Sequence, residues 1–149
     1  MAQDHASTAR QTYEDWNARE FDRIAAQMAD GGEILDVGSG TRFSGPEGSM
    51  QYSKMWADAF PDGRIQIDNV ISSGDTVVVE LTGRGTQTGT LKTPAGEIPA
   101  TGSTVTLQLC DVLEFTSDGK IKAQRSYFDS ASLLAQLGVK PEAGVTTKI

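Results

Sequence analysis

The stretch Thr104–Phe115, TVTLQLCDVLEF, decides how we interpret this chain. Side chains of a β-strand alternate between two faces, and one face of this stretch is apolar except for a single carboxylate. That face holds Val105, Leu107, Leu109, Asp111, Leu113 and Phe115. A carboxylate in the middle of an apolar row is a local conflict, and such conflicts tend to mark functional or strained sites. We therefore expect a long strand whose apolar face is covered by the rest of the chain.

Length and composition favour one ordinary globular domain. The chain has 149 residues, of which 38% are hydrophobic and 22% are charged. A net charge of −7 argues against nucleic acid and against an anionic membrane surface, since both require basic residues. There is no apolar run long enough to span a bilayer and no signal-peptide pattern, so we expect a cytoplasmic protein. The single cysteine and single histidine exclude a zinc site, and we expect no metal and no cofactor.

The periodicity of apolar residues predicts an α+β protein. Helical spacing and helix-start signals predict helices at residues 4–16, 21–28, 44–60 and 129–137. Alternation predicts strands at residues 33–37, 41–43, 64–72, 76–88, 104–115 and 120–128. Residues 29–32 are interpreted as the end of the second helix, and residues 91–102 as a Pro- and Gly-rich connection. This order predicts helices on one face of a curved antiparallel sheet, with one domain over 1–138 and a tail over 139–149.

Several motifs carry a resemblance to a known family. They are WNAREFD (16–22), FSGPEG (43–48), GTQTGTL (85–91), CDVLEFTSDGKI (110–121) and RSYFD (125–129), and together with W...FPD and QLG they cover most of residues 10–138. The chain resembles the nuclear-transport-factor-2-like superfamily, also called ketosteroid isomerase-like, and most of all the SnoaL-like polyketide cyclases. The resemblance implies a cone-shaped fold, in which three helices pack on the concave face of the sheet around a central cavity.

The resemblance also implies roles for two aspartates. The run ADGGEILD (29–36) resembles the ketosteroid isomerase segment whose last aspartate shuttles the proton, which makes Asp36 the candidate base. The run CDVLEF resembles the segment whose aspartate donates a hydrogen bond to the enolate oxygen, which gives that role to Asp111. Burial would keep this carboxyl protonated. The alternatives are structural: Asp111 paired with Arg125 or a backbone group, and Asp36 capping the turn 38–40.

The chain departs from both family patterns at three positions. The tyrosine of the isomerases aligns with Thr12, and Tyr13 stands next to it. The acid/base aspartate of the cyclases, on the last strand, aligns with Ser126, and a histidine of many relatives is replaced by Gln87. Alternation allows only one of Arg125 and Ser126 to face inward, and the pattern leaves open which one.

The remaining site candidates are residues that would line a cavity of this fold. Polar side chains on apolar strand faces contact a ligand or satisfy each other, and aromatic rows at helical spacing form either a cavity wall or plain core. The candidate substrate-binding residues are Tyr13, Trp16, Trp56, Asn69, Gln87, Arg125, Ser126 and Tyr127.

Function follows from these candidates as a prediction. We expect a SnoaL-like, cofactor-independent acid/base enzyme, an isomerase, aldol-type cyclase or lyase, that acts on a small apolar carbonyl or polyketide-like compound. The alternatives are a non-catalytic ligand-binding or scaffold protein, and an epoxide hydrolase that uses Asp111 and Arg125 on adjacent strands. The mixed second face of residues 104–115, with Thr104, Thr106, Cys110 and Val112, predicts a homodimer formed through the sheet.

Overall fold

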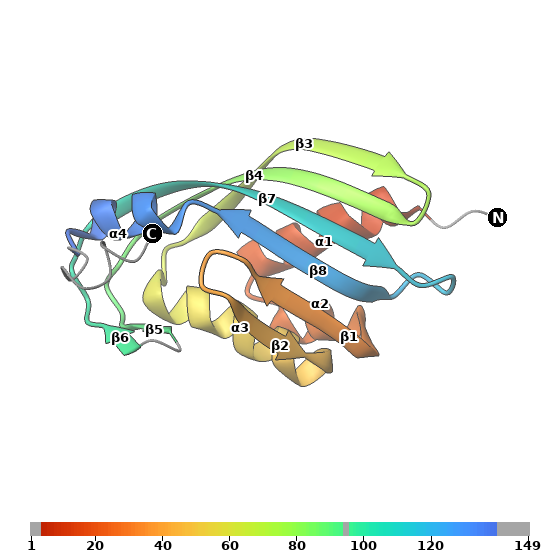
Figure 1. The fold of residues 1–149 in the computed structure, drawn as a ribbon, viewed down its shortest axis with the longest axis horizontal. Coiled ribbons are helices and arrows are strands. Elements are labelled where there is room, and N and C mark those ends of the chain that lie inside the picture. Colours follow the sequence, from red (N-terminus) through yellow and green to blue (C-terminus); the bar gives the residue numbers. More distant parts are fainter. Residues whose placement is uncertain (1–3, 94–95, 140–149) are drawn as a thin grey trace.

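The computed structural model describes residues 4–93 and 96–139, and it confirms the α+β cone fold (Figure 1). A curved six-stranded sheet carries three helices on its concave face, and a fourth helix and a small hairpin close one end. The helices are α1 (His5–Asn17), α2 (Phe21–Ala26), α3 (Gly45–Ala59) and α4 (Ser130–Leu137). The strands are β1 (Met28–Asp36), β2 (Thr41–Ser44), β3 (Arg64–Ser73), β4 (Thr76–Thr86), β5 (Leu91–Thr93), β6 (Gly96–Ile98), β7 (Thr104–Phe115) and β8 (Ile121–Phe128).

The large sheet is not wholly antiparallel. Its strand order is β2-β1-β8-β7-β4-β3, and β1 pairs with β8 in parallel. The other neighbours in this sheet pair antiparallel. This parallel pair joins the first third of the chain to its last strand. It places β1 two strands away from β7, with β8 between them.

Residues 29–32 belong to β1 and do not end a helix, so the predicted boundary was wrong. α2 ends at Ala26, and the strand register shifts between Met28 and Glu33 to accommodate the extra residues. Gly32 is needed here because a Cβ at this position would lie 2.8 Å from the backbone oxygen of Ile121 on β8. Gly32 therefore marks a close approach of two strands, although a pair of glycines resembles a turn in the sequence.

The predicted connection over residues 91–102 contains structure of its own. The short strands β5 and β6 form a separate two-stranded sheet near one end of α3 (Figure 1). α4 ends at Gly138, which adopts the left-handed conformation that glycine favours at a helix end. Of the predicted tail, residues 140–149 lie outside the described residues.

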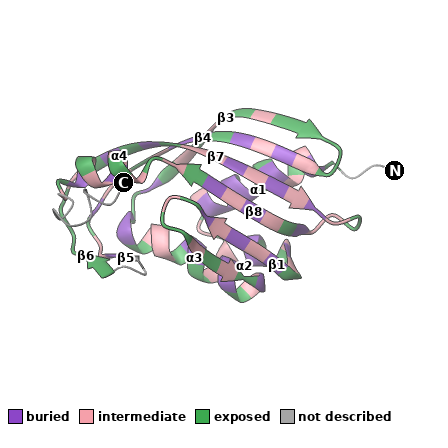
Figure 2. Cartoon of the chain, viewed as in Figure 1, coloured by how far each residue is buried: buried purple, intermediate pink, exposed green. Residues whose placement is uncertain are grey.

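The core lies between the concave face of the sheet and the helices (Figure 2). The predicted alternation of β7 is confirmed, because Val105, Leu107, Leu113 and Phe115 are all buried. On β4, Val77, Val79 and Leu81 form the matching buried row. Among the described helices, none is both long enough and apolar enough to cross a membrane.

Candidate functional site

Three neighbouring strands place polar side chains in one row on the concave face. In the strand register, Asp36 of β1 lies opposite Ser126 of β8, and Ser126 lies opposite Asp111 of β7. Residues directly opposite each other on adjacent strands point to the same side of a sheet. All three are buried, with exposed fractions of 0%, 1% and 4% for Asp36, Ser126 and Asp111.

Asp111 is a buried carboxyl group with one oxygen anchored and one free. The hydroxyl of Tyr13 on α1 donates a hydrogen bond of 2.8 Å to Oδ2 of Asp111. Oδ1 has no hydrogen-bond partner among the described residues. Burial raises the pKa of Asp111 to about 6, and the negative charge of Asp36 adds to the increase, whereas the nearby hydroxyl of Ser126 and the hydrogen bond from Tyr13 oppose it. The structural alternative in which Asp111 pairs with Arg125 is wrong, because Arg125 pairs with Glu114.

Asp36 is held by the turn that follows β1. Its Oδ1 accepts a hydrogen bond of 3.0 Å from the backbone N–H of Ser39, while Oδ2 has no partner in the described part of the chain. Burial raises the pKa of Asp36, and the polar contacts of Ser39 and Tyr52 partly offset this effect. Asp36 is not among the residues that line the cavity described below. It therefore lies on the same face as Asp111 but behind the cavity wall.

Tyr52 on α3 completes this polar group and was not proposed from the sequence. It is buried, and its pKa is raised well above the usual range of a phenol by burial and by the charges of Asp36 and Asp111. Its hydroxyl is therefore neutral and able to donate a hydrogen bond near both carboxyl groups. In the sequence, Tyr52 stands on the apolar face of a helix, where it cannot be told from an ordinary core aromatic residue.

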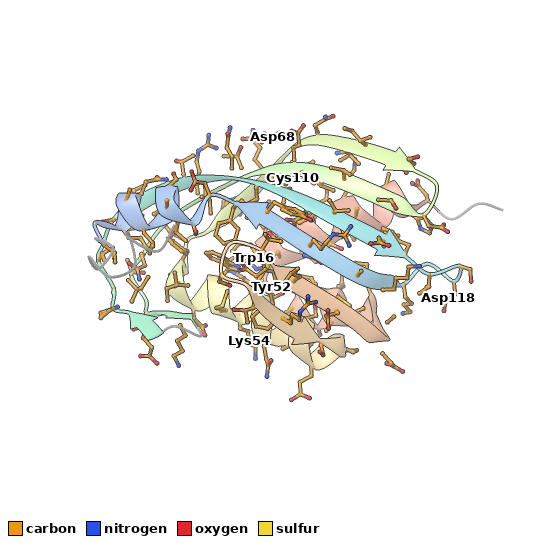
Figure 3. The ribbon with its side chains drawn as sticks, viewed as in Figure 1. Trp16, Tyr52, Lys54, Asp68, Cys110 and Asp118 are labelled. Carbon is orange, nitrogen blue, oxygen red and sulfur yellow. The ribbon has the colours of Figure 1, made fainter. Side chains whose placement is uncertain are left out.

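A cavity of about 130 Å³ opens in front of Asp111, between the sheet and the helices. Four predicted substrate-binding residues line it, namely Tyr13, Trp16, Trp56 and Ser126. Trp16 and Tyr52 lie in the space between the sheet and the helices (Figure 3). The rest of the wall is mostly apolar and includes Ile65, Leu81, Leu107, Leu109 and Leu133. The arrangement suits an apolar ligand with one polar group that contacts Asp111.

Two polar residues predicted to face the ligand have other partners. Asn69 is exposed on the convex side and donates a hydrogen bond of 3.1 Å to Glu80, because a bulge between Ile67 and Asn69 shifts the alternation of β3. Gln87 is fully buried, but the hydrogen bonds of its side chain hold the end of β6 and the residues that follow it. Its side chain bonds the backbone oxygens of Ile98 and Pro99 and both the N–H and the hydroxyl of Thr101.

The last strand turns Ser126 inward, so Arg125 and Tyr127 face the convex side. Arg125 forms an ion pair of 2.5 Å with Glu114. The side chain of Tyr127 is 42% exposed. Neither of these two predicted substrate-binding residues lines the cavity described above. No group of three or more His, Cys, Asp or Glu residues in the described ranges could hold a metal ion.

Comparisons with solved structures show the same fold. A protein assigned as a SnoaL-like polyketide cyclase from Jannaschia sp. CCS1 superposes with a TM-score of 0.79 at 21% identity, over 92% of this chain and 93% of its own. IdmH of Streptomyces antibioticus, assigned as a polyketide cyclase, gives 0.74 at 23% identity, over 92% and 100%. An LEH-like epoxide hydrolase of M. tuberculosis gives 0.67 at 20% identity, over 89% and 88%.

The search of curated sequences gave no significant match. The structural likenesses fall below 25% identity, so they establish the fold and leave the reaction open. Residues 6–137 match the family model described as SnoaL-like polyketide cyclase. Since that match spans most of the chain, the protein belongs to the SnoaL-like polyketide cyclase family.

Proposed function

We propose that this protein is a cofactor-independent acid/base enzyme that moves a proton next to the carbonyl group of a small apolar substrate. The observation that carries the proposal is the state of Asp111. Its carboxyl group is buried at the wall of an apolar cavity, has one oxygen without a partner, and has a pKa of about 6. A general base works best when its pKa lies close to the operating pH.

In this mechanism Asp111 is the proton-transfer group. At neutral pH it is mostly ionised, and Oδ1 takes a proton from the carbon beside the carbonyl group. The electron pair left on that carbon moves to the carbonyl oxygen and forms an enolate. Tyr13 holds Oδ2 during the transfer, so that Oδ1 stays directed at the cavity. Such positioning of a reacting group accounts for a large part of enzymatic rate enhancement.

The enolate oxygen requires hydrogen-bond donors. The hydroxyl groups of Tyr52 and Ser126 belong to the cavity wall and lie close to Asp111. Donors fixed at the place where negative charge develops lower the barrier more than the same donors do in water. The enolate then takes the proton back at another carbon, or attacks a second carbonyl group. These outcomes correspond to isomerisation and aldol cyclisation, and the reverse of the latter is a lyase reaction.

This assignment differs from the roles that the family resemblance implies. Asp36 was the candidate base, but it lies behind the cavity wall and its Oδ1 is bound to Ser39. We assign to Asp36 a positioning role, in which its negative charge raises the pKa of Asp111. We assign the base role to Asp111 because it lines the cavity and its Oδ1 has no hydrogen-bond partner among the described residues.

Epoxide hydrolysis is less well supported by the geometry. That reaction was considered because Asp111 and Arg125 stand on adjacent strands, but Arg125 faces the convex side and pairs with Glu114. In the strand register, the residue between Asp36 and Asp111 is Ser126. The row of side chains thus places a hydroxyl group where that mechanism requires a cation.

The test is hydrogen–deuterium exchange of an activated ketone. 2-Tetralone is apolar and bicyclic, and its exchange in D₂O can be followed by NMR with no knowledge of the natural substrate. We expect the protein to accelerate the exchange, and we expect Asp111→Asn to reduce that acceleration by a factor of about 10² to 10⁴. The control is Glu114→Gln, which makes the same carboxyl-to-amide change on the convex face of the same strand.

The result that would overturn the proposal is equally specific. If 2-tetralone binds, as shown by line broadening or calorimetry, and exchanges no faster than in buffer, the enzyme hypothesis fails for this site. The protein is then a ligand-binding member of its family. An equal loss of acceleration in Asp111→Asn and Glu114→Gln would show that the carboxyl group at the cavity has no special part in proton transfer.

A further inference from the structure

Gly83 interrupts the apolar row of β4. The row begins with Val77, Val79 and Leu81, all buried, and the alternation places residue 83 next on the same face. In the sheet, Gly83 lies opposite Ile65 on one side and Leu107 on the other. The row predicts a large apolar side chain at position 83, but glycine has no side chain.

The backbone does not require glycine at residue 83. Gly83 is not among the glycines with positive φ. A Cβ placed on it would lie 3.6 Å from Cδ1 of Leu109 and 3.9 Å from the backbone oxygen of Leu107, which are ordinary contact distances. Gly85 differs, because its Cβ would lie 3.1 Å from both Cα of Gly63 and Cβ of Phe60. Packing explains Gly85 and does not explain Gly83.

A glycine in the interior of a strand weakens the strand, and it often marks a place where a ligand approaches. Gly83 lines the same cavity as Asp111. Along β7, Gly83 lies opposite Leu107, which is four residues from Asp111. At 3.3 to 3.4 Å per residue, the two positions are about 13 Å apart. The cavity thus has one end at the carboxyl group of Asp111 and another at Gly83, where Leu107 and Leu109 line it together with Arg64 and Arg84.

We propose that Gly83 determines substrate specificity, because its missing side chain leaves room for the far apolar end of an elongated substrate whose oxygen-bearing end contacts Asp111. The orientation of the substrate rests on the proposed function. The substrate class that fits is an apolar carbonyl compound as long as two rings joined end to end, such as a biaryl or fused polycyclic ketone. A small monocyclic ketone would leave the space beside Gly83 empty.

The probes for the test are phenol and 4-phenylphenol. In the proposed orientation the hydroxyl group of each would donate a hydrogen bond to Asp111, and 4-phenylphenol would add a second ring in the direction of Gly83. Their dissociation constants are measured by calorimetry for the wild type, Gly83→Ala and Gly83→Val. We expect Gly83→Val to raise the dissociation constant of 4-phenylphenol about tenfold or more, and Gly83→Ala to raise it less. Both variants should change the dissociation constant of phenol by less than about twofold.

The control is Gly31→Ala, since Gly31 is exposed, has no positive φ and would place its Cβ in open space. Thermal unfolding shows whether each variant is folded, and Gly83→Ala keeps the test valid if Gly83→Val is not. An equal effect of Gly83→Val on both probes, or no effect on either, would overturn the proposal. The proposed function fails separately, if Asp111→Asn keeps the wild-type acceleration of 2-tetralone exchange.

Discussion

At the scale of single residues, Asp111 combines a cost in stability with the chemistry of the site. The folded protein holds this carboxyl group with a pKa of about 6, whereas the usual pKa of an aspartate, as in an unfolded chain, is 3.8. Between these two pH values the folded state binds more protons than the unfolded state, so its stability falls as the pH rises. A difference of about two pKa units corresponds to about 3 kcal/mol.

The first prediction follows from this sign. The free energy of unfolding of Asp111→Asn, relative to wild type, should rise by about 2 kcal/mol between pH 4 and pH 7, because the variant lacks the buried charge. Urea denaturation at several pH values measures this difference. In Glu114→Gln the trend should be opposite and small, since the ion pair with Arg125 lowers the pKa of a partly exposed group. A flat difference for Asp111→Asn would contradict the burial of an ionised carboxylate.

The second prediction separates the roles of the two aspartates. Asp36→Asn removes a negative charge beside Asp111, so it should lower the pKa of Asp111 and move the acidic limb of ketone exchange to lower pH. At pH 8, where Asp111 is ionised in both proteins, the exchange rate should fall less than about tenfold. If Asp36 is the base, as the family resemblance implies, the loss will match that of Asp111→Asn, about 10² to 10⁴.

The sequence indicated part of the site for physical reasons that can be stated residue by residue. Asp111 was recognisable because a carboxylate within an apolar strand face conflicts with its surroundings. Asn69 and Gln87 showed the same kind of conflict, but a bulge moved the first outward and a local hydrogen-bond network satisfied the second. Tyr52 produced no conflict, since a tyrosine on an apolar helix face is compatible with ordinary packing. Only the fold shows that its hydroxyl lies near two carboxyl groups.

At the scale of elements, Arg19 connects the end of α1 to the loop between α3 and β3. It has a φ of 62° and is the one described non-glycine residue with a positive value. Its guanidinium group donates to the backbone oxygens of Trp16, Pro61 and Gly63, and it lies 4.3 Å above the ring of Trp16. Trp16 and Gly63 both line the cavity, so this contact fixes one side of the wall.

The third prediction concerns this connection. Arg19→Ala should destabilise the fold by about 2 kcal/mol, because hydrogen bonds from a charged donor and a cation–π contact are lost together. Arg19→Lys should restore only part of the stability, since an ammonium group cannot reproduce the planar fork that reaches three oxygens. Urea denaturation measures both changes. Arg23→Ala, at an exposed position of α2, should change stability by less than about 0.5 kcal/mol. Equal effects of Arg19→Ala and Arg23→Ala would contradict the proposed connection.

An element could be predicted when the side chains that determine it are close together in the sequence. The alternation of β7 and the helical spacing of α1 and α3 depend on side chains that are close in sequence, so their bounds were close to those observed. The parallel pairing of β1 with β8 joins residues about 90 positions apart, and no local pattern encodes it. The same pairing explains why residues 29–32 were misjudged, because Gly32 allows the close approach of β8, which lies far along the chain.

At the scale of the whole molecule, the convex face of the sheet is more apolar than a solvated surface requires. Ile71, Val78 and Val112 form one row across β3, β4 and β7 in the strand register. Cys110 and Tyr127 lie opposite each other in the next row. Ile71 and Tyr127 are 53% and 42% exposed, and they are two of the three large hydrophobic residues exposed among the described residues. Apolar patches of this kind mark interaction surfaces.

The fourth prediction is that two copies of the chain associate through this face. Light scattering after gel filtration should give twice the mass of one chain, and the interface should bury at least about 1,000 Å² in total. Val112→Lys places a charge in the middle of the apolar row and should shift the protein to a monomer. Asp118→Lys, on the exposed hairpin between β7 and β8, should leave the mass unchanged. Because the convex face lies across the sheet from Asp111, the monomeric variant should keep its exchange activity, which would show that the cavity belongs to a single chain. A wild-type protein with the mass of one chain would rule out the dimer.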